Sequence, residues 1–247
     1  MNYVKNGKIG VVITAYKETA AQVLKAIDSV RGQDHFGENF EIVVAFDRDA
    51  ADTWFLEGLL EGNKVRAFYK SHSGVAATRN FGVEKLGDVE YIWCLDADTF
   101  LLFDDVLSKF VKALETAPER DYAYGRILIE RGESQYLAVS RPFSELALGQ
   151  QMFIPFAALI RADKWVGQDE SFPVLVDYEM WLEMYERNGS RGVLVPMVVL
   201  ANRIDEHSLS DVSVVSREER EKALEGIKEK HKKICPRIKN PLPDHES

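Results

Sequence analysis

Short β-branched runs alternate with segments of helical periodicity through the first hundred residues of this chain. The runs of strand length lie at residues 9–14, 40–46, 65–69 and 91–95. The segments with apolar side chains at helical spacing lie at residues 22–31, 52–60 and 75–86. Because consecutive parallel strands need a crossover connection, usually a helix, this alternation predicts an α/β fold with a mostly parallel sheet and helices on both faces.

The pattern is less regular after residue 100. Helical segments are expected at 103–115, 176–187 and 216–233, and strands at 121–129, 134–139, 156–160 and 192–200. We interpret residues 1–234 as a single domain. Prolines recur after residue 234, so residues 235–247 are expected to form a mobile tail.

The composition restricts what the chain can bind. A net charge of −9 argues against a nucleic-acid partner, which would need clustered lysine and arginine. No apolar run approaches the roughly 20 residues of a membrane span, and the first residues lack the apolar core of a signal peptide. Only two cysteines occur, Cys94 and Cys235, so a disulfide framework is not expected. These features predict a cytoplasmic protein without a transmembrane segment.

Polar side chains follow the first two predicted strands. Thr14-Ala15-Tyr16-Lys17-Glu18 leaves the first strand, and Asp47 leaves the second. Ligands of open α/β sheets bind outside the carboxyl ends of the strands. A hydroxyl, an aromatic ring and a carboxylate at this place would suit a nucleobase. The simpler alternative is an ordinary loop before a helix, with Thr14 near its cap.

The third strand is followed by Gly74 and, one helical turn later, by Arg79. Small residues at a helix N-terminus let an anion approach the backbone N–H groups there. A guanidinium nearby could bind a phosphate. The alternative for Arg79 is an ordinary surface ion pair.

The fourth strand delivers two carboxylates, one residue apart, in Asp96-Ala97-Asp98. Carboxylate oxygens suit Mg²⁺ or Mn²⁺, which commonly hold phosphorylated substrates. The alternative is a turn or a helix cap, a frequent use of aspartate. Convergence of four polar strand ends on one edge favours the binding site.

These segments together resemble family 2 of the GT-A glycosyltransferases, a family of inverting enzymes. The family's T-Y-N-like turn, S-x-x-x-Q helix end, E-I-I-V-V-D-D strand, G-x-x-A-A-R-N segment and D-x-D correspond to residues 14–17, 29–33, 41–47, 74–80 and 96–98. Its G-x-F-D-E and E-D-Y-E-L-W-L blocks and its R-x-x-x-H-x-S-x-S segment are similar to residues 167–172, 177–182 and 203–210. The matches keep the family's order over most of the chain.

The resemblance implies a GT-A fold that moves a sugar from a UDP-, GDP- or dTDP-linked donor to an acceptor hydroxyl, with inversion and with Mn²⁺ or Mg²⁺. The acceptor would be a saccharide, a lipid-linked or a protein acceptor. Residues 1–100 would form the nucleotide-sugar-binding half, 101–215 the acceptor and catalytic half, and 216–233 a charged C-terminal helix.

The resemblance also implies roles for individual residues. Asp177 would be the catalytic base, and Asp98 and His207 would bind the metal. Asp96, about 6–7 Å from Asp98 along an extended backbone, would contact the ribose or a metal-bound water. The donor-binding residues would be Thr14, Ala15, Tyr16, Glu18, Asp47, Gly74, Arg79, Asp96 and Ala97.

Two departures from the family pattern leave alternatives open. Val176 stands where the family has a glutamate before its base, and Glu183 stands where an arginine is frequent. A binding module that keeps the fold without catalysis is therefore one alternative. A nucleotidyltransferase-like enzyme is another, although the loop at residues 14–18 contains no glycine.

The charged segment at residues 216–233 has two interpretations. It mixes a glutamate-rich part with a lysine-rich part. We expect a solvated helix that covers the domain. The sharper alternative is a basic patch that brings the protein to a membrane surface, which would suit a lipid-linked acceptor.

Overall fold

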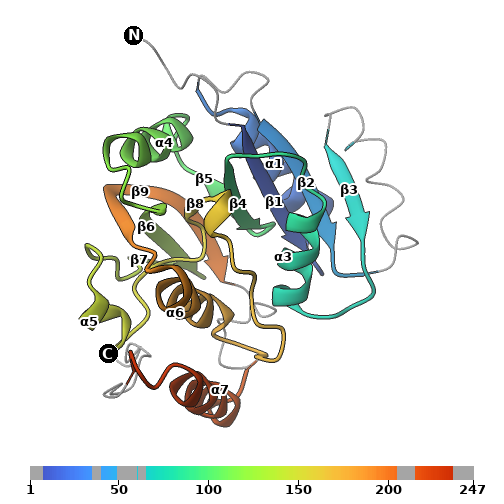
Figure 1. Cartoon of the computed structure of the whole chain (residues 1–247). Coiled ribbons are helices and arrows are strands. Elements are labelled where there is room, and N and C mark those ends of the chain that lie inside the picture. The colour runs from blue at the N-terminus through green and yellow to red at the C-terminus, as the bar shows by residue number, and fades with distance from the viewer. Residues whose placement is uncertain (1–7, 35–39, 49–59, 61–64, 205–214, 236–247) are drawn as a thin grey trace.

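The computed structural model describes residues 8–34, 40–48, 60, 65–204 and 215–235 (Figure 1). Within these residues, one sheet of nine strands has the order β3-β2-β1-β4-β8-β6-β9-β5, and β7 pairs with β6. The predicted α/β class is confirmed. The helix expected at 52–60 falls outside the described residues, apart from Leu60.

The first half of the sheet is parallel throughout. It contains β1 (Ile9–Ala15), β2 (Phe40–Phe46), β3 (Arg66–Tyr69) and β4 (Tyr91–Asp96). The chain adds β2 and β3 on one side of β1 and then β4 on the other. Ligands of open α/β sheets bind where the strand order reverses in this way. The fold therefore has its switch point between β1 and β4.

Helices cover both faces of this half because the central strands are buried on both. On one face, α1 (Ala20–Arg31) shares an apolar core with alternate strand residues such as Val11 and Val44, and α4 (Val106–Thr116) joins this core through Phe110, which contacts Trp93 of β4. On the other face, α3 (Val75–Glu84) packs against Val12. Successive side chains of each strand face opposite sides of the sheet, so the strands contribute to two separate apolar cores.

The second half of the sheet is mixed. It contains β5 (Thr99–Leu101), β6 (Tyr122–Arg131), β7 (Ser134–Leu137), β8 (Leu159–Arg161) and β9 (Gly192–Ile204). β6 runs parallel to β9, whereas β8 is antiparallel to β4 and β6. The predicted strands of this half are confirmed with shifted ends. The sequence did not predict β5, a three-residue strand that pairs with β9.

Within the described residues, four helical segments follow β7 along the chain. They are α5 (Glu145–Leu148), the 3₁₀ helix η2 (Ala162–Lys164), α6 (Val176–Asn188) and α7 (Arg217–Lys230). α6 lies between α7 and the sheet (Figure 1) and shares an apolar core with Tyr122, Ile160 and Leu224. Trp181 is 1% exposed in this core.

Two further expectations concern membrane-spanning helices and the cysteines. Among the helices that the structure describes, none has the length and apolar character needed to cross a membrane. Cys94 and Cys235 are both buried and are not joined by a disulfide in the structure.

Candidate functional site

The polar strand ends meet at one edge of the sheet, as the sequence predicted. Thr14 on β1 lies opposite Asp96 on β4, and the ends of β2 and β3 are also in register. The Thr14 hydroxyl donates to Oδ1 of Asp96 at 2.6 Å. This bond joins the two strands across the switch point, so Thr14 orients the first carboxylate of the D-x-D.

Arg79 on α3 stands at the centre of the site, between two carboxylates. Its Nη2 donates to both oxygens of Asp96, at 3.0 and 2.9 Å, and its Nη1 donates to Oδ1 of Asp177 at 2.6 Å. The guanidinium lies 4.4 Å from the centroid of the Phe156 ring. Arg79 is 3% exposed, so the surface ion pair considered from the sequence does not apply. The arginine links the D-x-D to the proposed base.

The two carboxylates face outward more than the arginine does. The side chains of Asp96 and Asp177 are 25% and 23% exposed, against 3% for Arg79. A cation that is fully enclosed while its carboxylate partners remain accessible can fix those carboxylates for contact with a ligand. The predicted phosphate contact of Arg79 stays a prediction, and in this structure its Nη1 and Nη2 bond protein oxygens.

Burial changes the acid–base chemistry of this cluster. It raises the pKa of Asp177, and the nearby charge of Asp96 adds to that effect, although Arg79 opposes both. Burial alone would lower the pKa of Arg79, but the charges of Asp177 and Asp96 outweigh it and raise the value. Arg79 therefore stays protonated while Asp177 is a stronger base than an ordinary aspartate.

Asp177 occupies the first turn of α6, the place that the sequence predicted. The residue before this helix, Leu175, has φ +60°, the left-handed region that a branched side chain rarely adopts. Such strain persists only where the surroundings impose it. The backbone that presents Asp177 is therefore held in place by its neighbours.

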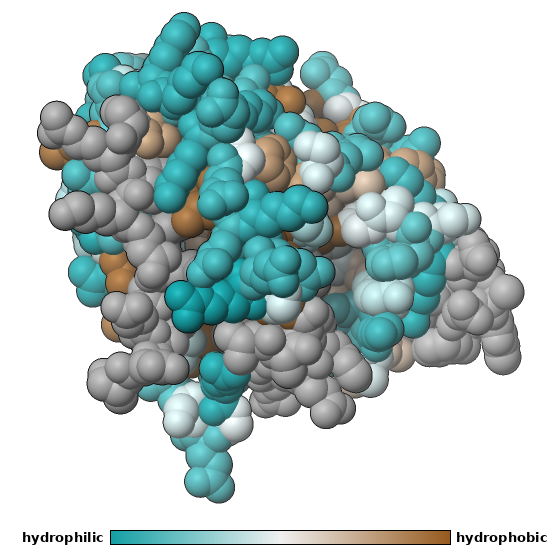
Figure 2. Space-filling model, turned by 90° about the horizontal axis from the view of Figure 1, so that it is seen from below, coloured by the Kyte–Doolittle hydropathy of each residue, from teal (hydrophilic) through white to brown (hydrophobic). Residues whose placement is uncertain are grey.

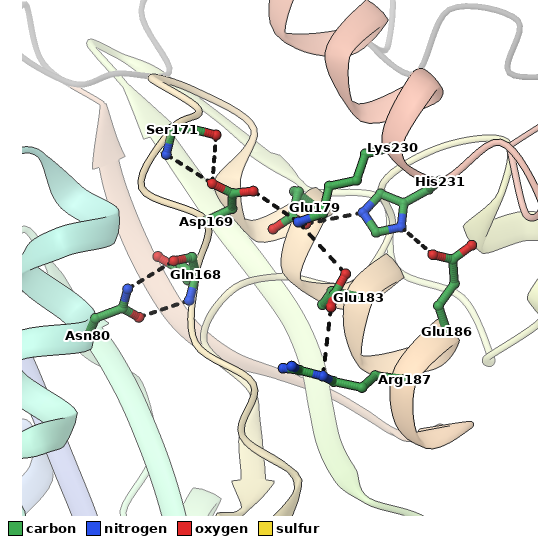
Figure 3. A network of polar contacts seen from close by, with 10 residues as sticks. All are labelled: Asn80, Gln168, Asp169, Ser171, Glu179, Glu183, Glu186, Arg187, Lys230 and His231. Atoms are coloured by element: carbon green, nitrogen blue, oxygen red, sulfur yellow. Dashed lines mark hydrogen bonds and ion pairs between the residues drawn. The ribbon is translucent and has the colours of Figure 1, made fainter.

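Gln168 and Asn80 complete the support of Asp177, and no role was assigned to them from the sequence. Nε2 of Gln168 donates to Oδ1 of Asp177 at 2.9 Å, and Gln168 is 6% exposed. Asn80 accepts from the Gln168 backbone N–H and donates to its carbonyl, at 2.8 and 2.9 Å (Figure 3). The signal was present, since both residues lie inside the motif segments 74–80 and 167–172.

Asp47 organises the loop that leads into α3. Its carboxylate accepts from the backbone N–H groups of Ser73 and Gly74, at 2.7 and 3.1 Å, and lies 2.8 Å from Nδ1 of His72. Gly74 has φ +90°, a conformation that favours glycine. The predicted donor-site residues Asp47 and Gly74 therefore fix one loop together.

The turn after β1 carries an exposed aromatic surface. The rings of Tyr16 and His72 stack with centroids 4.3 Å apart. The Tyr16 N–H donates to the carboxylate of Glu18 at 2.5 Å. Burial raises the pKa of Glu18, against the effect of that bond. Ala15 ends β1 beside this turn and is buried.

The structure describes one of the two proposed metal ligands. Asp98 lies in the turn between β4 and β5, after the buried Ala97. His207 lies outside the described residues, so the structure does not test its predicted role.

Sequence comparisons find relatives that are described as glycosyltransferases. A chain described as an uncharacterized glycosyltransferase from Rickettsia bellii is 29% identical over 136 residues, which are 54% of this chain and 19% of that protein. A second, from Rickettsia felis, is 34% identical over 110 residues, which are 44% and 17% of the two chains. The chain spans less than a third of the length of these curated relatives.

Solved structures share the fold. TarS residues 1–349 from S. aureus, crystallised with UDP-GlcNAc, matches with a TM-score of 0.68 at 15% identity, over 89% of this chain and 65% of that one. The mannosyltransferase PcManGT from Pyrobaculum calidifontis, with GDP-Man and Mn²⁺, matches with a TM-score of 0.66 at 16% identity, over 97% and 66%.

The family model described as glycosyl transferase family 2 matches residues 10–174. This range holds every proposed donor-binding residue and Asp98, and it ends just before α6. It covers well over half of the 247 residues. The chain therefore belongs to glycosyl transferase family 2.

Proposed function

We propose that this chain transfers a sugar from a nucleotide diphosphate to an acceptor hydroxyl, with inversion at the anomeric carbon. The observation that supports this most is the Arg79 bridge, which holds a D-x-D carboxylate and the carboxylate of Asp177 together at the switch point. A donor contact and a base lie side by side there. A single displacement needs both, and it needs no covalent intermediate.

Asp177 would act as the general base for the acceptor hydroxyl. General-base catalysis contributes roughly 10²–10⁴-fold and works best when the pKa of the base approaches the working pH. The raised pKa of Asp177 fits that role. Gln168 and Arg79 both donate to Oδ1, which leaves Oδ2 for the acceptor proton.

The donor would lie along the strand ends from β3 to β4. The nucleobase and ribose would contact the turn at Thr14, Ala15, Tyr16 and Glu18 and the loop held by Asp47 and Gly74. The stacked Tyr16 ring offers a flat, exposed surface of the kind that bases bind. UDP-GlcNAc and GDP-Man are present in two structures of this fold, which supports a nucleotide sugar as the donor.

The carboxylate ligands available at this site suit a divalent cation. Asp96 and Asp98 offer hard carboxylate oxygens, and such oxygens suit Mg²⁺ and Mn²⁺. Because Asp96 is already balanced by Arg79, we assign direct ligation to Asp98, with His207 as its partner. When bound, the cation would supply positive charge to the diphosphate leaving group.

A donor panel tests this function. The protein would be incubated with UDP-GlcNAc, GDP-mannose or a dTDP-sugar, with Mn²⁺, Mg²⁺ or EDTA, while thermal stability and released nucleoside diphosphate are measured. We expect one donor to raise the unfolding temperature and to be turned over, with loss of both effects in EDTA and in Asp98→Ala. Donor binding without release, even when saccharide acceptors are supplied, would instead favour a non-catalytic module.

A further inference from the structure

A second cluster of charge joins the C-terminal helix α7 to the elements that carry Asp177 (Figure 3). Nζ of Lys230, the last residue of α7, lies 2.6 Å from Glu179 on α6, 2.9 Å from Asp169 in the preceding loop and 3.7 Å from Glu183. One ammonium therefore bridges the loop and the helix. Its partners flank the site residues, because Asp169 follows Gln168 and Glu179 lies two positions after Asp177.

His231 extends this bridge into the core. Its Nε2 lies 3.1 Å from Glu179 and its Nδ1 lies 2.8 Å from Glu186. The histidine is 0% and the Glu179 side chain 1% exposed. Burial alone would lower the pKa of His231, but the two carboxylates outweigh it and raise the value. The two carboxylates therefore favour the charged form of the imidazole, which lies at the C-terminal end of α7, where a cation is favourable.

Apolar packing from α7 reaches the strained backbone before Asp177. Leu175 and Phe172 pack on a cluster formed by Val174, Val215 and Ala223. Gly226 allows the close approach, since a Cβ there would lie 2.9 Å from the Phe172 ring. α7 therefore covers Leu175, the residue with positive φ, and contacts the chain on both sides of it.

A metal ion is a less suitable explanation for this cluster. Glu179, Glu183 and His231 present ligand atoms within 4.8 Å of one another. The Lys230 ammonium already lies between the two glutamates, and both histidine nitrogens face carboxylates. The positive charge that these carboxylates need comes from the chain itself.

We propose that Lys230 and His231 are positioning residues: they couple the docking of α7 to the placement of Asp177 and Gln168. This inference rests on the proposed role of Asp177 as the base. It also accounts for Glu183, which departs from the family pattern. Where the family frequently has an arginine, this chain has a carboxylate that faces Lys230, so part of the local positive charge comes from α7.

The test compares Lys230→Met with Lys232→Met in the full chain. Lys232 is also a lysine of the C-terminal segment, but its side chain is 73% exposed and pairs locally with Glu229. Release of nucleoside diphosphate would be measured with the donor that the panel identifies. We expect Lys230→Met to lower kcat about tenfold or more, since small misplacements of catalytic groups are costly. KM for the donor would stay within about twofold, because the proposed donor contacts lie on β1 to β4.

Matched variants separate positioning from stability. Lys230→Arg should restore most of kcat, and Lys232→Met should behave as wild type. Asp169→Asn breaks the bridge at a partly exposed side chain and tests the proposal if Lys230→Met fails to fold. In Lys230→Met, the rate of backbone amide hydrogen exchange should rise at residues 167–180 and stay unchanged in β1 and β4. Unchanged kcat in folded Lys230→Met or Asp169→Asn would overturn the proposal.

These measurements also distinguish a failure of the proposed function from a failure of the positioning proposal. If the wild type releases no nucleoside diphosphate from any donor, the proposed function fails. The hydrogen exchange of residues 167–180 would then still show whether Lys230 controls this segment. Unchanged exchange there in Lys230→Met would overturn the coupling itself.

Discussion

Two clusters of charge in this molecule are built alike and differ in which charge they enclose. Around Arg79, the cation is enclosed and its partners Asp96 and Asp177 are about a quarter exposed. Around Lys230 and His231, the enclosed group at the centre is instead a carboxylate, that of Glu179, which is 1% exposed, while the outer carboxylates are 25–28% exposed. A buried ion pair is weak evidence for stability alone. We therefore propose that the cluster around the enclosed Arg79 is the reacting one, and that the cluster around the enclosed Glu179 holds α7 in place.

The position of each cluster in the fold agrees with this division. The Arg79 cluster joins α3, β4 and α6 at the switch point, where ligands bind. The Lys230 cluster joins α6 to α7 on a face that is largely covered by hydrophilic residues in Figure 2. Lys230 and His231 point inward from the lysine-rich part of the C-terminal segment. A membrane-binding patch would therefore have to do without them, and the solvated helix is favoured.

The largest effect is expected from Arg79→Met. The change removes the cation that both Asp96 and Asp177 contact and leaves their like charges uncompensated. We expect release of nucleoside diphosphate to fall at least about 100-fold, and the free energy of unfolding to fall by about 1–3 kcal/mol, below the usual cost of breaking a fully buried pair. Denaturant unfolding and donor turnover measure both.

Arg79→Lys is the matched control for that change. It keeps the charge but cannot donate to two carboxylates in one plane. We expect stability to recover more than activity does. Full activity in Arg79→Met would contradict the role of this cluster as the reacting one.

The next effect concerns the pH dependence of turnover. Asp177 must be deprotonated to act, and its pKa is raised, so activity is present above the folded pKa and lost as the pH falls through it. We expect kcat/KM to fall about tenfold per pH unit on an acid limb that lies above the ordinary aspartate value of about 3.9. Turnover that stays constant down to pH 4 would argue against Asp177 as the base.

The cluster around Lys230 and His231 should make the stability of the protein depend on pH. The pKa of His231 is raised in the folded state, so its stabilising contribution is complete below the unfolded value of about 6.5 and is lost as the pH rises through the folded value. We expect the unfolding midpoint in urea to decline across this window in the wild type. His231→Asn should flatten that decline. An equal decline in both proteins would show that another group causes it.

The smallest effect is expected from Gln168→Leu. The change removes one hydrogen bond to Asp177, a bond that lowers the pKa of the carboxyl group. A hydrogen bond worth about 1 kcal/mol corresponds to less than about one pH unit. The acid limb of turnover should therefore move upward by that amount, with activity at higher pH reduced only a few-fold. A limb that does not move would remove Gln168 from the support of the base.

The sequence predicted the first half of the fold well because the relevant information is local there. Each apolar run specifies a buried strand, each strand end carries its polar residue, and parallel topology brings those ends together. Thr14, Asp96 and Asp47 therefore lie where the pattern indicated. Asp177 was placed through a motif match and then found at the start of α6.

Partners that depend on tertiary packing could not be predicted in the same way. Arg79 and Asp177 are 98 positions apart, and Lys230 and Asp169 are 61 apart. No local pattern states which carboxylate an arginine or lysine will meet. β5 was missed for a similar reason, since its three residues pair with β9, a strand about 100 positions further along the chain.

The central claim is that Asp177 reacts while its neighbours hold the site together. The direct measurement is a comparison of wild type and Asp177→Asn for donor affinity and for release of nucleoside diphosphate under saturating donor and Mn²⁺. Our account predicts that Asp177→Asn binds the donor within a few-fold of wild type and releases nucleoside diphosphate at least about 100-fold more slowly. Release at the wild-type rate from the folded variant would contradict it.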